Sequence, residues 1–599
     1  MKTRHLWFGS GNYSLLGHLD VPQEDCVGTG VVIVPPFGWE EVCSYRPLRF
    51  MAQTFARMGF PTLRYDLPGT GDSSGGAQDP GLFESWINSV EDAACELRYS
   101  AGVENVTVVG IHLGAILALI AASRGADFQA MALWGPAARG RTILRELRAL
   151  ANIERAESLA EQDAPPQPIP GFVASGFLIA PEMQRALEDL DISALSWPRF
   201  KRILLLSRDD LPPDAKLIAA LQRSAANVHM AAGHGYSAMM AAPQEAQCPE
   251  DTSRRIAEFL TEGSRPRARR DPARASAAGA TIVGDCPPNE CFESIYRIET
   301  SALSMFGILA EPASGVPRSD ACVLYLNPGG VRHIGPNRMW VESARRWAPQ
   351  GVISLRLDLQ SIGESEGDQY LDVPSLYREE QMRQIEVAID SLRVRTGVKR
   401  FVAIGLCSGA CWGFHAAVRS PDIRAAILLN PSLLYWDPGA DRRRIFRDLA
   451  GGYSRWAEWT QLVRSRIQRG DIERAVCRLA ERLGRRRTRQ TGYLQMPFET
   501  AALAWSFFER GQKRVTLVFR DGEPLLAELE AAGELPLGTN CFARCVRVPN
   551  GGHTFRPLWA QKLVHDLIDD QLASVMGAAP PAWEQPPDDR DVSPKAVRA

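Results

Sequence analysis

Short apolar runs, rich in β-branched residues and bounded by Gly or Pro, recur along the chain, and each is followed by a longer stretch with helical spacing of its apolar residues. In chain order the clearest runs are Val31–Val34, Thr62–Asp66, Val106–Val109, Ala321–Leu326, Ser354–Asp358 and Phe401–Ile404. A run that is apolar throughout is typical of a strand buried on both faces, and its alternation with helices predicts βαβ units on a parallel sheet. The pattern therefore predicts the α/β fold class.

The same order of runs occurs twice, which predicts two tandem domains of one layout. We expect lobe I at residues 1–262, a flexible linker at 263–280, lobe II at 281–576 and a disordered tail at 577–599. The linker is rich in Arg, Pro and small residues and has no apolar period, while the tail is rich in Pro and Asp.

Composition excludes several classes of protein. Hydrophobic residues make up 45% and charged residues 23% of the chain, as in globular proteins rather than fibrous or disordered ones. The 68 basic and 70 acidic residues leave a net charge of −2, so we expect no nucleic-acid partner. No apolar run approaches the roughly 18 residues of a membrane span, and the first residues lack the apolar core of a signal peptide. The sequence therefore predicts no membrane span and a cytoplasmic location.

The 12 cysteines are scattered, and most lie inside apolar segments. In a reducing compartment such cysteines are typical of small buried hydrophobic residues rather than disulfide bridges. The pairs Cys286/Cys291 and Cys541/Cys545 lack the doubled spacing and the neighbouring His of a zinc site. We therefore expect neither a metal nor a cofactor.

A Gly-x-Cys-x-Gly sequence, residues Gly405–Gly409, lies where a predicted strand meets a predicted helix. In this arrangement, a nucleophile elbow, the central residue occupies a strained turn at a helix N-terminus. Cys407 is thus the candidate nucleophile, because a thiolate is favoured there; the alternative is an inert buried thiol. The backbone N–H of Ser408 is the expected oxyanion donor, and the loop Gly329–Val331 supplies the second, for which we choose Gly330.

The partners of such a nucleophile are expected in the order acid, then His. The predicted strand Val515–Phe519 leads to Asp521 and Glu523, and either carboxylate could orient a base. His553 follows Gly551 and Gly552 after a terminal strand, which is the position expected of a general base.

Lobe I has the same frame with a different residue at its elbow, His112. The run Ile203–Leu206 leads to Asp209 and Asp210, and His234 occupies the later Gly-flanked loop. An imidazole forms a labile acyl product, and a second His cannot activate it as it activates a hydroxyl. We therefore interpret His112, Asp210 and His234 as a degenerate site.

Several further segments carry a resemblance to a known family. They are Pro35–Gly38, Ser44–Leu48, Leu63–Ser73, Leu144–Leu147 and Gly171–Phe172 in lobe I, and His333–Arg338, Leu355–Asp358 and Ile362–Ser365 in lobe II. On these residues both lobes resemble α/β-hydrolases, and more narrowly the small hydrolases associated with bacterial exosortase and exopolysaccharide loci. The resemblance implies two α/β-hydrolase domains with hydrolase activity.

The chain departs from this family at the elbow, where members mostly have Ser. Cys407 is similar to the nucleophile of dienelactone hydrolases. In related sequences the acid commonly precedes a Pro or a similar turn residue, which favours Glu523, before Pro524, over Asp521, although Asp is the commoner acid.

Both lobes carry an insertion after the elbow helix, at Arg139–Asp191 and from Ser432 to about Phe498. We expect each to form a helical lid that excludes water from the site. Trp456 and Trp459 could line an acyl pocket, although Trp at helical spacing is more often core. The arginines Arg485–Arg487 could meet an anionic carrier or simply form a solvated face.

These residues together predict a hydrolase of esters or thioesters that works through an acyl-Cys407 intermediate. One alternative is an acyltransferase that passes the acyl group to an alcohol or amine. Another is a non-catalytic binding or scaffold protein. The expected partner is a small-molecule or carrier-bound acyl substrate.

Overall fold

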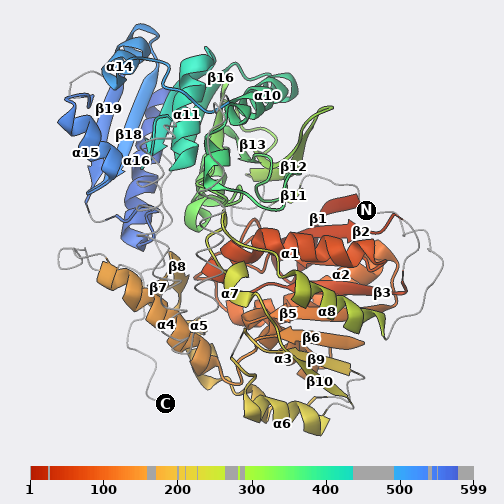
Figure 1. Ribbon diagram of the computed structural model, residues 1–599. Helices are drawn as coiled ribbons and strands as arrows, with labels where there is room; N and C mark the ends of the chain where they lie inside the picture. Colours follow the sequence, from red (N-terminus) through yellow and green to blue (C-terminus); the bar gives the residue numbers. More distant parts are fainter. Residues whose placement is uncertain are drawn as a thin grey trace, which may run out of the picture.

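The computed structural model describes residues 2–23, 27–157, 170–197, 202–209, 211–224, 227–262, 281–282, 291–435, 492–536, 542–549 and 551–577. They form two α/β lobes, one below the other in Figure 1. The predicted linker, the tail beyond residue 577, Asp210 and most of the lobe II insertion, residues 436–491, lie outside the described residues. Within the described ranges, no helix is both long and apolar enough to cross a bilayer.

Lobe I contains an eight-stranded sheet in the order β1-β2-β4-β3-β5-β6-β9-β10. The strands are β1 (Lys2–Ser10), β2 (Tyr13–Val21), β3 (Thr29–Val34), β4 (Thr62–Tyr65), β5 (Asn105–Ile111), β6 (Ala130–Trp134), β9 (Arg202–Leu206) and β10 (Val228–Ala231). β1 and β2 pair antiparallel, β2 also pairs antiparallel with β4, and the strands β4, β3, β5, β6, β9 and β10 are parallel to one another. The apolar runs of the sequence thus form the buried parallel strands, as predicted.

Helices cover both faces of this sheet because each presents an apolar stripe to it. One face packs against α2 (Leu82–Ala101) and α3 (Leu113–Ser123), and the other against α1 (Trp39–Arg57) and α8 (Glu250–Thr261). The short helix α6 (Ala215–Ser224) connects β9 to β10, and α7 (Tyr236–Met239) lies between β10 and α8 in the chain.

Lobe II repeats this topology in a nine-stranded sheet, β11-β12-β13-β15-β14-β16-β17-β18-β19. The strands are β11 (Thr281–Ile282), β12 (Cys291–Glu299), β13 (Ser304–Pro312), β14 (Ala321–Leu326), β15 (Ile353–Asp358), β16 (Arg400–Leu406), β17 (Ile423–Leu429), β18 (Arg514–Arg520) and β19 (Ala543–Val548). Without the edge strand β11, the order matches lobe I strand for strand. In each lobe an antiparallel strand pair precedes a parallel sheet, and the elbow follows the third parallel strand along the chain, β5 in lobe I and β16 in lobe II. This arrangement is the α/β-hydrolase fold.

The lobe II sheet is also covered on both faces. The helices α10 (Glu379–Thr396), α11 (Ser408–Arg419) and α14 (Ala501–Arg510) pack on one face, and α9 (Met339–Trp347) and α16 (Leu558–Met576) pack on the other. Helix α15 (Pro524–Ala531) connects β18 to β19. Short 3₁₀ turns occur at Ile192–Ala194, Pro336–Arg338, Ala348–Gln350 and Val373–Tyr377.

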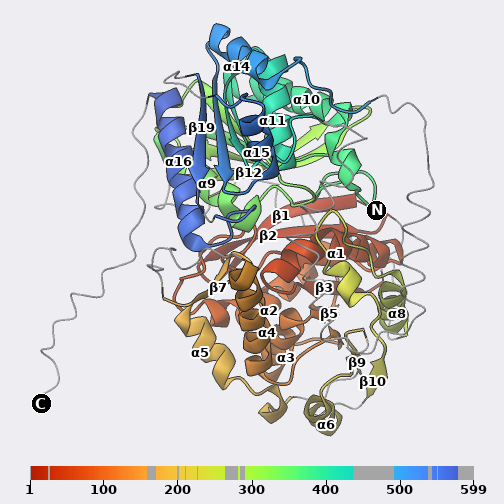
Figure 2. The same cartoon turned by 60° about the vertical axis from the view of Figure 1, so that its left-hand side comes forward.

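The insertion of lobe I contains the helices α4 (Gly140–Glu157) and α5 (Pro181–Asp189), as the lid prediction requires. Between them lies a β-hairpin that the sequence pattern did not predict, formed by β7 (Phe172–Ala174) and β8 (Phe177–Ile179). This hairpin extends toward lobe II, as Figure 2 shows.

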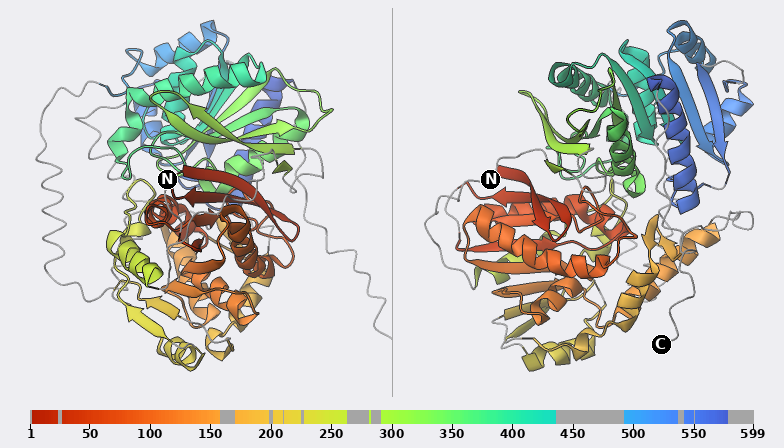
Figure 3. Two further views of the ribbon diagram at one scale, coloured as in Figure 1. Left: turned by 90° about the vertical axis from the view of Figure 1, so that its right-hand side faces the viewer. Right: turned by 180° about the vertical axis from the view of Figure 1, so that it is seen from behind.

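The two lobes meet along their antiparallel strand pairs (Figure 3). Leu16 of β2 packs against Phe306 and Ile308 of β13 in one apolar cluster. Around this cluster the polar contacts are reciprocal. The guanidinium of Arg46 donates to the carbonyls of Gly363 and Ser365, and that of Arg338 donates to the carbonyls of Gly71 and Ser73. Such self-complementary pairing is the pattern of a two-fold interface.

A buried ionic network lies at the centre of this interface. The imidazole of His333 lies 2.6 Å from Asp72 of lobe I and 2.8 Å from Asp358 of lobe II. Burial alone would lower the pKa of His333, but the two carboxylates raise it to about 10. The ring therefore carries a charge that ties the lobes together at neutral pH.

Candidate active site

The elbow of lobe II positions Cys407 between β16 and α11. Its backbone has φ 57° and ψ −115°, a conformation that costs energy for a non-glycine residue and is typical of functional turns. The flanking glycines are required by space. A Cβ on Gly405 would lie 2.1 Å from the Gly409 carbonyl oxygen, and one on Gly409 would lie 2.5 Å from that of Leu326. Because both positions are glycine, β16 and α11 can pack closely on either side of the turn that presents the Cys407 thiol.

The loop after β19 brings His553 to a carboxylate. Its Nδ1 lies 2.7 Å from Oε1 of Glu523, a side chain only 2% exposed. The Nε of Arg520 donates to the other oxygen of Glu523 at 2.6 Å. Burial alone would raise the pKa of Glu523, but these two cations lower it. The other candidate acid, Asp521, is exposed to solvent.

Cys407 and His553 form an electrostatic pair. Burial disfavours the thiolate, but the neighbouring imidazole lowers the pKa of Cys407 below its usual value. Burial likewise opposes the charge on His553, but Glu523 and the cysteine raise the pKa of the ring to about 10. The buried Nε2 of His553 makes no other hydrogen bond to any described residue, so it is available to the sulfur. The pair can exist as thiolate and imidazolium at neutral pH.

Two residues that the sequence reasoning missed complete this arrangement. The hydroxyl of Ser432 lies 3.3 Å from the Cys407 sulfur. The buried amide of Asn430 donates to the His553 carbonyl at 2.8 Å and accepts from the Arg520 N–H at 2.7 Å. Asn430 directly follows β17, and Ser432 comes two residues later. Their position at the carboxyl end of a central strand was the only signal for them.

The loop Gly329–Val331, here called the oxyanion-side loop, lies against the elbow at Ser408. Ser408 turns its buried hydroxyl toward this loop, where it accepts from the Gly329 N–H at 2.8 Å. The Val331 N–H donates to the Pro328 carbonyl. Within the described part of the chain, the N–H groups of Ser408 and Gly330 have no hydrogen-bond partner. These are the two amides that the sequence singled out.

The elbow of lobe I holds a different set of charges. His112 has φ 50° and ψ −109°, so the turn itself is preserved. Its Nδ1 lies 2.7 Å from Glu40 and its Nε2 lies 3.1 Å from Glu146. Burial alone would lower the pKa of His112, but the two carboxylates raise it to about 9. Both ring nitrogens are therefore occupied, and the ring is held as a cation.

The expected partners of His112 have other surroundings. His234 is exposed, and its carbonyl accepts from the Thr252 hydroxyl. Asp209 accepts from the backbone N–H groups of residues 235–237. Asp210 lies outside the described residues. The carboxylates that do meet His112 come from α1 and α4. Glu146 lies in the resemblance segment Leu144–Leu147, but the sequence did not link that segment to the elbow.

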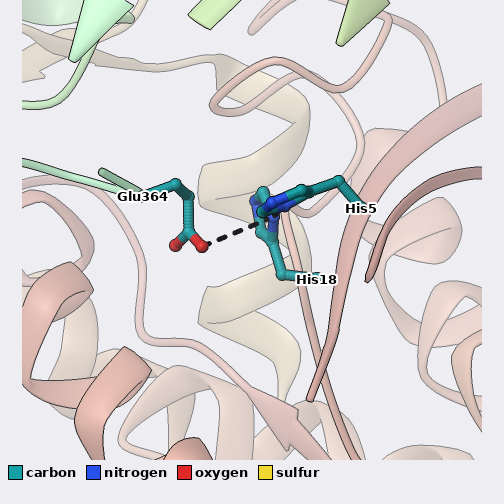
Figure 4. Close-up of side chains that lie close together, drawn as sticks. All are labelled: His5, His18 and Glu364. Carbon is teal, nitrogen blue, oxygen red and sulfur yellow. Dashed lines mark hydrogen bonds and ion pairs between the residues drawn. The ribbon is translucent and has the colours of Figure 1, made fainter. Parts of the chain in front are cut away.

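A cluster of two histidines and a glutamate, His5, His18 and Glu364, lies at the lobe interface (Figure 4). The histidine Nδ1 atoms are 2.7 Å apart, and burial lowers the pKa of His5 to about 3. Both oxygens of Glu364 accept from Arg64, at 2.9 and 3.2 Å, and Arg49 lies 3.6 Å away. Because two guanidinium groups already neutralise the carboxylate, this cluster is a polar joint between the lobes and does not fit a metal cation.

Comparison with known proteins yields similarity at the level of structure. No family model and no curated protein matches the chain. Est1E from Butyrivibrio proteoclasticus, solved with ferulic acid bound, is 17% identical, with 43% of this chain and 98% of that chain covered and a TM-score of 0.31. An α/β serine hydrolase without a lid from Xanthomonas campestris is 13% identical, with coverages of 49% and 99% and a TM-score of 0.30. An esterase from Pyrococcus furiosus is 12% identical, with coverages of 48% and 91% and a TM-score of 0.32. Strand order and elbow geometry, rather than these matches, define the fold of each lobe.

Proposed function

We propose that the protein is a hydrolase of ester or thioester bonds that works through an acyl-thioester on Cys407. The observation that carries the proposal is the alignment of three groups. The elbow presents the sulfur, the imidazole of His553 pairs with it, and Glu523 holds the far side of that imidazole at 2.7 Å. This is the arrangement of a nucleophile, a base and an orienting acid.

In the proposed reaction the Cys407 thiolate attacks the substrate carbonyl. The N–H groups of Ser408 and Gly330 bind the oxyanion, for which each donor can supply about 3–4 kcal/mol. The C–O or C–S bond of the substrate then breaks, and the imidazolium of His553 gives its proton to the departing alcohol or thiol. Water attacks the acyl-thioester, His553 takes the proton of that water, and the acid leaves as the thiolate is restored.

Acyl transfer is the second candidate. Cys407 is only 8% exposed, so little water reaches an acyl group on its sulfur. A thioester is also attacked by amines more readily than by water. An acceptor alcohol or amine that displaces water from the site would then take the acyl group. No metal or cofactor is needed for either reaction.

The test is a screen of aryl esters and thioesters, with and without amine acceptors. We expect turnover by the natural chain and none by Cys407→Ala. The matched control is Cys411→Ala, which removes a buried thiol one helical turn away and should retain turnover. Turnover that survives in Cys407→Ala would refute the proposal. If the natural chain turns over none of these substrates, the result would favour the hypothesis of a non-catalytic binding or scaffold protein.

A further inference from the structure

Two glycine-containing loops of lobe II that the proposed reaction uses are packed against lobe I. The first is the oxyanion-side loop. A Cβ on Gly330 would lie 2.8 Å from the backbone N of Gln244 and 2.9 Å from the carbonyl carbon of Pro243. The space beside Gly329 is occupied by the Gln244 amide, whose Oε1 lies 3.0 Å from the position of a Cβ there. Backbone and side chain of one lobe I segment thus support the loop that offers an oxyanion donor.

Gln244 contributes to this contact by packing. The residue is buried, with 7% of its surface exposed. Among the described residues, neither polar atom of its side chain belongs to the fully buried atoms that lack a hydrogen-bond partner. The Gln244 side chain therefore supports the loop that carries the Gly330 N–H by filling the space beside it.

The second loop is the one that carries His553. The hairpin β7–β8 of lobe I turns at Gly176, which has φ 89°. The Gly176 carbonyl accepts from the Nε2 of Gln561 at 3.0 Å, and the same nitrogen donates to the Arg556 carbonyl at 2.7 Å. The amide of Asn337, which donates to the Thr554 carbonyl at 3.2 Å, would be 2.2 Å from a Cβ on Gly176. The tip of the β7–β8 hairpin at Gly176 therefore packs against the segment that directly follows His553.

We propose that lobe I acts as a built-in brace for the active site of lobe II, with Gln244 and Gly176 as positioning residues. Gln244 supports the oxyanion-side loop, and the Gly176 turn supports the His553 loop. The inference rests on the proposed function, because it concerns the geometry of that same site. Lobe I would then have a role that requires no chemistry at His112. Such support matters because a displacement of about 1 Å at a reacting group can lower the rate about 100-fold.

The test uses the full chain and two pairs of variants. Gly176→Ala introduces a methyl group against Asn337, and Gly125→Ala is its control. Gly125 also lies in lobe I, has φ 104°, and has nothing within 4 Å of an added Cβ. Gln244→Ala removes the amide, and its control is Gln247→Ala, an exposed residue three positions along. If Gly176→Ala does not fold, Gln561→Ala tests the same joint from lobe II.

We expect Gly176→Ala to lower kcat about 10- to 100-fold with little change in KM, and to raise the pKa of the Cys407 thiol measured by alkylation, because the base is displaced. We expect Gln244→Ala to lower kcat and leave that thiol pKa unchanged. Both controls should behave as the natural chain. Equal kcat values within each pair would overturn the brace while leaving the hydrolase proposal intact. Turnover by Cys407→Ala would instead overturn the hydrolase proposal.

Discussion

Arg64 of lobe I and Arg356 of lobe II lie at equivalent positions of β4 and β15, and each guanidinium reaches across the interface to an acid of the other lobe. Arg64 donates to Glu364 at 2.9 Å, and Arg356 donates to Asp72 at 3.0 Å. Both arginines are buried. The repeated sequence pattern around them therefore builds the joint between the lobes rather than a catalytic site.

Removing one of these arginines should weaken the protein markedly. In Arg356→Met, Asp72 and Glu293 lose a buried cationic partner, and removal of one partner of a buried pair costs about 3–5 kcal/mol. Urea unfolding measures the loss. Arg124→Met is the control, because Arg124 pairs with Glu84 on the surface and such a pair contributes about 0–1 kcal/mol. Equal losses in the two variants would contradict the assignment.

The charge of His333 predicts a pH dependence of stability. Because the folded-state pKa is raised to about 10 from an ordinary value of 6.5, protonated His333 contributes its full stabilisation below about pH 6.5. That contribution declines as pH rises from about 6.5 to 10. The difference in unfolding free energy between the natural chain and His333→Gln should therefore shrink over this range. The exposed residue Gln247, which does not titrate, provides the control, since the effect of Gln247→Ala on the unfolding free energy should not vary with pH.

The structure distinguishes the two candidate acids by their contacts. Glu523→Gln removes the negative charge that faces Nδ1 of His553, so we expect kcat to fall about 10²- to 10⁴-fold. Asp521→Asn changes an exposed side chain in the same loop and should keep kcat near that of the natural chain. Initial rates of the two variants, measured on a substrate found in the screen, give the two kcat values to compare. The reverse order of effects would show that Asp521 is the acid.

Ser432 should tune the thiol of Cys407. Its hydroxyl is 3.3 Å from the sulfur and helps to lower the pKa of that cysteine. In Ser432→Ala the pKa of Cys407 should rise toward its ordinary value, which is measured by the pH dependence of iodoacetamide alkylation. Exposed Cys95 serves as the internal reference in the same sample. An unchanged alkylation profile would mean that the hydroxyl has no part in holding the thiolate.

Much of the fold could be predicted because a buried parallel strand leaves a strong apolar signal. The runs Val31–Val34 and Ala321–Leu326 both lie within central strands of their sheets. The antiparallel pairs β1–β2 and β12–β13 escaped prediction, because their polar and charged residues face the other lobe and break the alternation. His5 and His18, for example, lie in the interface, and a single sequence does not reveal which surfaces meet.

The candidate site was predictable where chain order constrains chemistry and not elsewhere. An elbow, an acid and a late histidine occur in a known order, so Cys407 and His553 could be named, and the structure pairs them. Asn430 and Ser432 act through contacts made after β17 ends, and no spacing rule marks such residues. The partners of His112 were also hidden, because Glu40 and Glu146 come from helices rather than from the strand ends that the pattern singles out.

Trapping the acyl group on the protein tests most directly whether Cys407 is the nucleophile. The natural chain is mixed with an activated aryl ester, quenched in acid within the first turnover, and digested for mass spectrometry. We predict that one acyl group is found on the peptide that contains Cys407, and that none is found there in Cys407→Ala. An acyl group on Ser408 or Ser432 instead, or turnover with no adduct on Cys407, would show that Cys407 is not the nucleophile.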